Sequence, residues 1–274
     1  MPAVKLSFSE VVSESAGFFF GNIRLFFHLV TVPWILSLAI RVGGELLAMD
    51  TPLAVLAERA IDIIPTVMFL VAWQRVVLLG PHRLDRLPGT GWSARETAYL
   101  GHLIKVGGMT FALIAIFIAT IGSVDPTTLS AGGRAMDPEA ARRYALAGPI
   151  AIGFVVSLLL ALRVSWGLAA TAVDVPFSPR QSWALSRGNA WTIIGALFLT
   201  FFGGAFATAM ALTFTAGLMR GLLGAREGAA VVALTVALLC SYGAAALTVT
   251  AQAVIFRRLL GWREGHPLPV PADS

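Results

Sequence analysis

The sequence D-V-P-F-S-P-R-Q-S-W-A-L-S-R-G-N-A-W, from Asp174 to Trp191, is a short, basic, amphipathic segment between two long apolar runs. The run before it, Tyr144 to Val173, contains one charged residue, Arg163, and the run after it, Ala190 to Met219, contains none. About 20 helical residues cross the hydrocarbon core of a bilayer, which is roughly 30 Å thick. The pattern therefore predicts two transmembrane helices joined by a segment at the membrane surface.

The composition of the whole chain extends this prediction. Of its 274 residues, 57% are hydrophobic and 13% are charged, whereas soluble domains carry about 25% charged residues. The net charge of +5 comes without any dense basic run, so it indicates basic loops beside the membrane and no nucleic-acid partner. We expect an all-α, polytopic membrane protein with a single integral membrane domain, residues 1–274.

Apolar runs predict six transmembrane helices in total. An amphipathic helix at residues 7–20 is expected to precede the first. A short, mostly acidic link is expected between the first two, and it carries Glu45, Asp50, Glu58 and Asp62. The six expected helices are Ile23–Val42, Ile61–Leu79, Leu103–Ile121, Tyr144–Val173, Trp191–Leu218 and Gly228–Phe256.

One order of features recurs three times, at residues 7–80, 92–174 and 178–261. Each copy is expected to form a hairpin of two transmembrane helices preceded by a short interfacial amphipathic helix. Serines and glycines before helices are also ordinary helix-start chemistry, so the pattern allows a true repeat or a coincidence. The proposed caps pair Ser7 with Glu10, Ser93 with Glu96 and Ser178 with Gln181; the breaks are Gly21-Asn22, Gly101-His102 and Gly188-Asn189; and an arginine lies near the end of each even-numbered helix, at Arg75, Arg163 and Arg257.

The distribution of positive charge predicts the orientation. Most of the 20 Lys and Arg residues fall on the side of the membrane that holds the N-terminus. Cytoplasmic loops carry such an excess, so both termini are expected in the cytoplasm. The mostly apolar run from Phe18 to Ile40 is longer than that of a signal peptide and has no small-x-small site after it. We therefore expect it to remain as the first transmembrane helix.

Arg163 is the leading candidate site residue, because a charge inside an apolar run is costly and commonly functional. It could bind a lipid phosphate or an anionic substrate, or its long side chain could simply reach the membrane surface. The second explanation is stronger for Arg75 and Arg257, which lie close to a glycine that ends the helix. Asp174 could pair with Arg163 or Arg187, or cap the following segment. The full candidate set for lipid or anion binding is Arg163, Arg180, Arg187, Asn189, Arg75 and Arg257.

No residue set predicts an active site. His28 and His102 are isolated and lack the spacing of metal or haem ligands. The motifs of hydrolases, zinc proteases, P-loop proteins and dinucleotide-binding folds do not occur. We therefore expect no enzymatic activity, no metal and no cofactor. The single cysteine, Cys240, can form no intrachain disulfide.

Small residues recur every four positions in the last apolar run, which would let another helix approach closely. They are Ala233, Ala237, Ser241 and Ala245, and Gly203 with Ala207 gives the fifth helix a shorter version. These faces predict helix packing within the chain or, alternatively, a homo-oligomer.

The sequence S-W-A-L-S-R-G-N-A-W, Ser182 to Trp191, resembles the A-W-x-L-T-x-G-N-x-W pattern of bacterial six-helix membrane proteins. These are the YciC-like proteins and the membrane domain that precedes some glycerophosphoryl diester phosphodiesterases. Arg163 and A-V-D-V-P at Ala172 to Pro176 also look like this family, and the resemblance covers nearly the whole chain. It implies an all-helical domain in the bacterial cytoplasmic (inner) membrane with no assigned activity. The phosphodiesterase domain and its metal-binding carboxylates are not in this chain, so no phosphodiesterase activity is implied.

Two functions remain open from the sequence. The first is a non-enzymatic protein that engages anionic membrane lipids, or a membrane partner, through its interfacial helices. The second is a small transporter or channel for a lipid or an anionic solute, which the repeat and Arg163 favour. A polar, water-accessible cavity would distinguish them, because transport needs one and lipid engagement does not.

Overall fold

The computed structural model describes residues 5–47, 51–80, 91–121, 130–131, 134–135, 138–177, 179–223 and 227–262. These residues are almost entirely helical, as predicted. A pair of two-residue antiparallel strands, β1 (Ser130–Ala131) and β2 (Arg134–Ala135), lies between the fourth and fifth helices. The helices are α1 (Phe8–Gly21), α2 (Ile23–Leu46), α3 (Pro52–Leu79), α4 (Ala94–Ile121), α5 (Pro138–Val164), α6 (Trp166–Ala172), α7 (Pro179–Leu185), α8 (Ala190–Leu223) and α9 (Glu227–Leu260).

Four helices in the described part of the chain are long and apolar enough to cross a membrane: α2, α4, α8 and α9. An integral membrane protein is therefore compatible with the structure. The corresponding segments are Ile23–Leu46, Ala94–Phe117, Ala190–Leu222 and Gly228–Leu260. The spans expected in α3 and α5 are not among them, so the arrangement of six spans in three hairpins stays a prediction.

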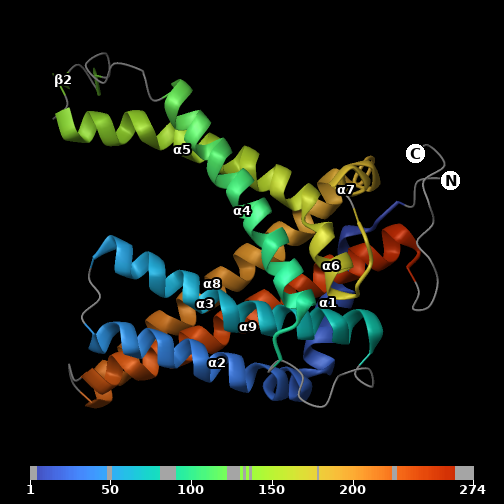
Figure 1. Cartoon of the computed structure of the whole chain (residues 1–274). Coiled ribbons are helices and arrows are strands. Elements are labelled where there is room, and N and C mark those ends of the chain that lie inside the picture. The colour runs from blue at the N-terminus through green and yellow to red at the C-terminus, as the bar shows by residue number, and fades with distance from the viewer. Residues whose placement is uncertain are drawn as a thin grey trace.

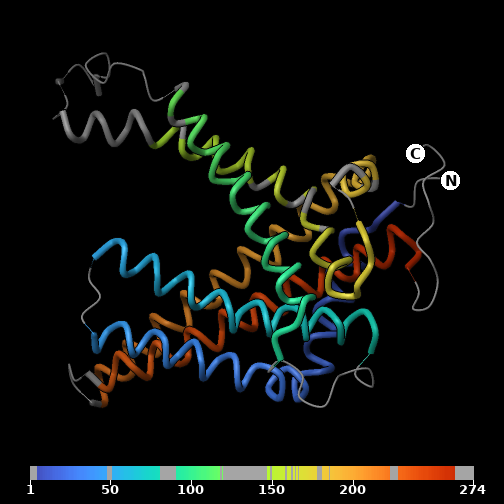
Figure 2. Tube along the Cα trace, in the orientation of Figure 1, coloured from blue at the N-terminus to red at the C-terminus, as the bar shows by residue number. Residues whose placement is uncertain are grey.

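The body of the molecule consists of α2, α3, α8 and α9, with α1 across one end (Figures 1 and 2). We call this the α1 end; it also holds α6, α7, the start of α4 and the C-terminal end of α9. The second half of α3 is buried on nearly every side, with Trp73 and Phe69 fully inaccessible. A helix that is apolar all round is expected in such a central position.

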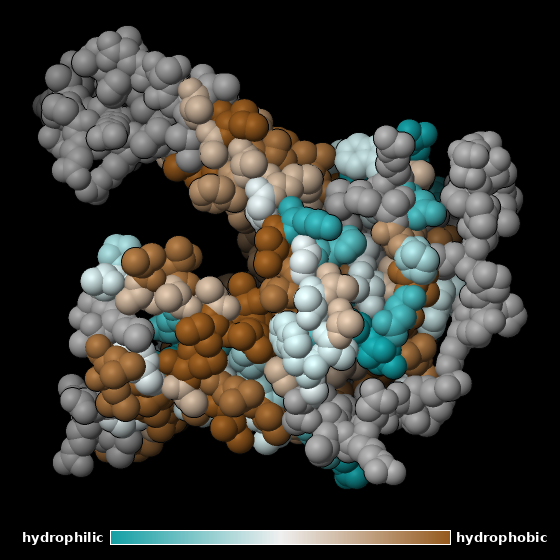
Figure 3. All heavy atoms as spheres, viewed as in Figure 1, coloured by the Kyte–Doolittle hydropathy of each residue, from teal (hydrophilic) through white to brown (hydrophobic). Residues whose placement is uncertain are grey.

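Helices α4 and α5 pack along each other and diverge from the body as an arm (Figures 1 and 2). In the most apolar stretch of α4 no residue is buried within the protein. Figure 3 shows a hollow between the arm and the body, with mainly apolar residues on its visible walls. The arm exposes large side chains that include Phe111 of α4 and Phe154 of α5.

The predicted helix breaks are present at two of three places. Asn22 separates α1 from α2, and Gly188, with φ of 83°, lies between α7 and α8. The break expected at Gly101-His102 is absent, because α4 continues through it. His102 there fills the space beside Gly167 of α6, where a Cβ atom would lie 2.4 Å from the imidazole Nε2. Packing against α6 thus favours a continuous helix at Gly101-His102, where the intrinsic helix propensity is low.

Two further boundaries differ from prediction. The expected helix Tyr144–Val173 is interrupted at Ser165, so that α5 ends just after Arg163 and α6 begins a new direction. The acidic link is also shorter than expected. Helix α3 begins at Pro52, with Thr51 as an N-cap whose hydroxyl accepts from the Ala54 amide. Glu58 and Asp62 are therefore helical residues.

The close contact between α8 and α9 uses a different glycine from the one predicted. Gly203 and Ala207 are exposed, whereas neighbouring Gly204 faces Ala244 of α9. On α9, Ala233 is buried and Ala237 and Ala245 are half-buried, while Ser241 is exposed. The predicted contact residue of α8 was therefore wrong by one position. Where two helices cross depends on the position of the partner helix as well as on the spacing of small residues.

Candidate functional site

Arginines near the ends of three helices lie at the α1 end of the molecule. Arg75 belongs to α3, Arg163 to α5 and Arg257 to α9. Each contacts a segment that is distant in sequence, yet the three differ in how their charge is balanced.

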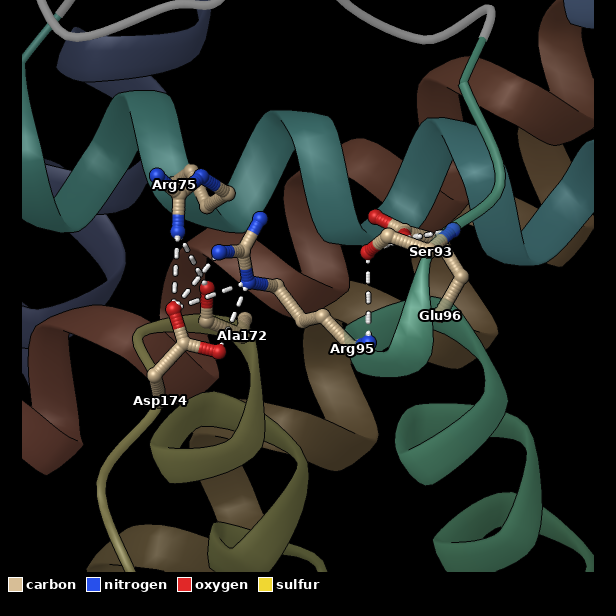
Figure 4. Close-up of polar contacts among 6 residues, drawn as sticks. All are labelled: Arg75, Ser93, Arg95, Glu96, Ala172 and Asp174. Atoms are coloured by element: carbon tan, nitrogen blue, oxygen red, sulfur yellow. Dashed lines mark hydrogen bonds and ion pairs between the residues drawn. The ribbon is translucent and has the colours of Figure 1, made fainter.

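Arg75 and Arg95 share one carboxylate, Asp174 (Figure 4). Arg95 Nε lies 2.9 Å from Oδ1 of Asp174, and Arg95 Nη2 lies 2.6 Å from Oδ2, so the contact is bidentate. Arg75 Nη1 donates to the Ala172 carbonyl at 3.1 Å and lies 3.6 Å from Oδ2 of Asp174. The cluster ties α3 to the first turn of α4 and to the α6–α7 link.

The partner of Asp174 was predicted wrongly. We expected Arg163, Arg187 or a capping role, but Asp174 pairs with Arg95 and Arg75. The interruption at Ser165 turns α6 away from α5, and Asp174 then adopts the left-handed conformation, φ of 60°. The carboxylate consequently lies at the junction of α3 and α4, a position that local sequence does not reveal.

The three proposed capping boxes have three outcomes. Glu96 Oε2 accepts from the Ser93 amide at 2.8 Å, and Ser93 Oγ accepts from the Arg95 amide at 3.2 Å (Figure 4), so the cap before α4 is confirmed. Ser7 stands at the N-cap of α1 without a capping bond from its side chain, so that cap was wrong. Ser178 lies outside the described residues.

Arg163 is held by α7. Its Cζ lies 3.7 Å from the centroid of the Trp183 ring, and its Nε donates to Ser186 Oγ at 3.0 Å. Ser182 Oγ donates to the carbonyl of Arg163 at 2.6 Å, so both ends of the residue are fixed. Within the described part of the chain no carboxylate pairs with this guanidinium. Among these residues its charge is therefore uncompensated, and its Nη groups form no hydrogen bond with them.

The other residues of the basic segment have separate environments. Arg187 is exposed, and it follows Ser186 directly. Asn189 is buried, and its Oδ1 accepts from the Leu6 amide at 2.9 Å, so it ties the start of the chain to the α7–α8 link. Arg180 belongs to α7, and its side chain is outside what the structure describes.

Arg257 is paired, together with Arg258, to two glutamates of α1. Arg258 Nε lies 2.9 Å from Oε2 of Glu14, and Arg257 also contacts Glu14. Glu10 completes the cluster through Arg258. Two cations and two anions balance, so this cluster holds α1 against α9 and leaves no excess charge. The i,i+4 spacing of Glu10 and Glu14 on α1 was the signal in the sequence for this contact.

Comparisons with known proteins give no match: no protein-family model, no curated protein and no solved structure is detectably similar to this chain.

Proposed function

We propose that this protein is a non-enzymatic integral membrane protein that binds the phosphate of anionic lipids at its α1 end, chiefly through Arg163. The observation that carries the proposal is the state of that guanidinium. It is stacked on Trp183 and bonded through Nε to Ser186, with no acidic partner among the described residues. Arginine presents a planar fork that suits phosphate oxygens, and here the fork is oriented before any ligand arrives.

The contrast with the other two arginines supports this choice. Arg257 is neutralised by Glu14, and Arg75 is shared with Asp174 and the Ala172 carbonyl. An anion at either would compete with an existing carboxylate, whereas among the described residues Arg163 has no carboxylate partner. Arg187, exposed beside Ser186, adds a second positive charge for an anionic surface.

The proposed placement in the membrane follows the six-span arrangement. We propose that α3 and α5 cross together with α2, α4, α8 and α9, with the α1 end on the cytoplasmic side of a bacterial inner membrane. Membership of the YciC-like family, suggested by the motif at Ser182 to Trp191, is part of the same proposal. That motif supplies Trp183 and Ser186, the two residues that hold Arg163.

Native mass spectrometry of the full chain released from nanodiscs tests the lipid site. With nanodiscs that contain phosphatidylglycerol, we expect retained anionic lipid on the wild type. We expect at least a tenfold loss of retention for Arg163→Gln, in line with the loss of a charge-assisted bidentate contact, about 1.5–3 kcal/mol. Arg163→Lys should recover only part, because an ammonium lacks the fork. The same spectra report the number of subunits.

Arg220→Gln is the matched control, since Arg220 is exposed in the last turn of α8, away from α7. It removes the same charge and should leave lipid retention unchanged. Equal loss in both variants would mean that only net charge matters. Full retention in Arg163→Gln would mean that Arg163 is a surface anchor, and either result would contradict the proposed site.

A second candidate is movement of lipids between leaflets, for which the hollow beside the arm offers an apolar surface and not the polar cavity expected of a solute transporter. No residue in the most apolar stretch of α4 is buried within the protein, so lipid chains would cover its exposed apolar side chains in a bilayer. Proteoliposomes with fluorescent phospholipid in both leaflets would measure it: dithionite should then quench well beyond the half of the signal that protein-free vesicles lose. Quenching equal to that of protein-free vesicles would exclude this candidate for the lipid tested.

A further inference from the structure

The hydroxyl of Ser186 can act toward Arg163 only as an acceptor. Ser186 is fully buried, and its Oγ donates its one proton to the carbonyl of Trp183 at 2.8 Å. A serine oxygen has two acceptor sites besides this donor, and Arg163 Nε donates to it at 3.0 Å. The orientation of the guanidinium therefore depends on where the Ser186 backbone lies.

The backbone of Ser186 is held by bonds on both of its sides. Its amide donates to the carbonyl of Ser182 at 3.2 Å, and its carbonyl accepts from the Asn189 amide at 3.3 Å. Gly188 lies between them with φ of 83°, a conformation that glycine adopts without steric cost. The bond from Asn189 closes the turn after α7. The position of Ser186 thus depends on the position of Asn189.

Asn189 is in turn held by the segment that precedes α1. It is 4% exposed, and its Oδ1 accepts from the Leu6 amide at 2.9 Å. Its carbonyl accepts from the Ile193 amide at 3.0 Å at the start of α8. Leu6 is buried, and two residues later the Phe8 ring lies against α8, where a Cβ atom on Gly195 would be 3.3 Å from Phe8 Cε2. The segment before α1 is therefore packed against the beginning of α8.

We propose that Asn189 is a positioning residue for the lipid site and that the segment before α1 orients Arg163 through it. The Leu6 amide holds Asn189 Oδ1, and the Asn189 amide holds the Ser186 carbonyl. Ser186 Oγ then holds the guanidinium. Loss of the first bond takes a donor from a buried oxygen, which is costly, so the α7–α8 link shifts toward water and Ser186 shifts with it. The inference rests on the lipid site proposed at Arg163.

Native mass spectrometry with phosphatidylglycerol nanodiscs measures the effect on lipid retention. Asn189→Ala removes the acceptor, and we expect retention to fall roughly threefold to tenfold. This loss is smaller than that of Arg163→Gln, because the guanidinium remains. Leu6→Pro removes the donor, since proline has no N–H, and should act in the same direction without changing α7 or α8. The double variant should lose no more than the larger single loss, because both changes break the same bond.

Nitrogen-15 NMR of the full chain reads the orientation of Arg163 directly. Its Nε–H signal, assigned by its loss in Arg163→Gln, should shift in Asn189→Ala and exchange faster with water. Asn22→Ala is the matched control, since Asn22 stands at the break between α1 and α2 and donates its Nδ2 to the Phe18 carbonyl at 2.8 Å. It should change neither the signal nor lipid retention.

Full lipid retention in Asn189→Ala, together with loss in Arg163→Gln, would overturn the inference and leave the lipid site standing. An equal loss in Asn22→Ala would also overturn it, because the effect would then be a general loosening of the α1 end. Full retention in Arg163→Gln would contradict the lipid site itself. The Nε–H signal would still decide between an Asn189 that orients Arg163 and one that does not.

Discussion

Replacing Trp73 by alanine is expected to lower the free energy of unfolding by about 3 kcal/mol, the low end of the range for buried Trp→Ala changes. Trp73 is 0% exposed and its ring centroid lies 5.9 Å from that of Phe26 and 6.3 Å from that of Phe69. Lipid is as apolar as this core. Transfer of the Trp73 side chain between lipid and core therefore contributes little to the free energy of unfolding. The cavity and the lost ring contacts then account for most of the effect.

Unfolding in mixed micelles of increasing SDS fraction measures this change. Trp191→Ala is the control, because Trp191 is 82% exposed and should shift the free energy by no more than about 0.5 kcal/mol. Trp73→Phe keeps an aromatic ring, but it removes the indole bond to Thr250 Oγ1, 2.8 Å, and leaves a smaller cavity than alanine does. Its cost should lie between roughly 0.6 kcal/mol, the mean for such bonds in a membrane protein, and the cost of Trp73→Ala. Equal effects at Trp73 and Trp191 would mean that α3 is not the centre of the bundle.

Two adjacent glycines of α8 are expected to respond to alanine with opposite signs. A Cβ atom on Gly204 would lie 2.5 Å from Cβ and 3.0 Å from Cα of Ala244. Gly204→Ala must therefore separate α8 from α9, and overpacking of this kind costs about 1–3 kcal/mol. Nothing lies within 4 Å of the same position on Gly203. Gly203→Ala should instead stabilise the helix by roughly 0.5–1 kcal/mol, because alanine loses less backbone freedom on folding.

Both alanine variants can be measured by the same SDS titration, each against the wild type. Each variant is the control for the other, because both replace glycine by alanine at adjacent positions of α8. Stabilisation by both variants would show that α8 and α9 do not cross at Gly204 in the membrane. Destabilisation by Gly203→Ala would instead indicate that the exposed face of α8 is covered by a second copy of the chain.

Local sequence was enough to predict several features of this fold. Apolar runs located α2, α8 and α9 to within a few residues, because hydropathy and helix length are properties of the segment itself. The breaks at Asn22 and Gly188 were also predictable, since both follow the start and stop chemistry of single helices. The Ser93–Glu96 cap belongs to the same group, since it joins residues only three apart.

Features that depend on packing were missed or placed wrongly. The interruption at Ser165 has no proline or glycine at its centre, and it determines where Asp174 lies. The predicted break at Gly101-His102 is overridden by the contact with Gly167. Asp62 was expected in a link, although it lies within α3 and forms a half-buried ion pair with Arg41 of α2.

The sequence by itself determined that this chain is an apolar helical protein and where most of its long helices lie, because the composition of a segment determines whether it favours water or lipid and whether it favours a helix. Only the tertiary structure decided which charges are compensated. Arg257 meets Glu14, 243 residues away in sequence, whereas Arg163 meets an aromatic ring and a hydroxyl. A hydropathy scale gives these two arginines the same free-energy cost in a membrane. They differ because different segments of the folded chain pack against them. Their availability to an anion is therefore a property of the folded bundle.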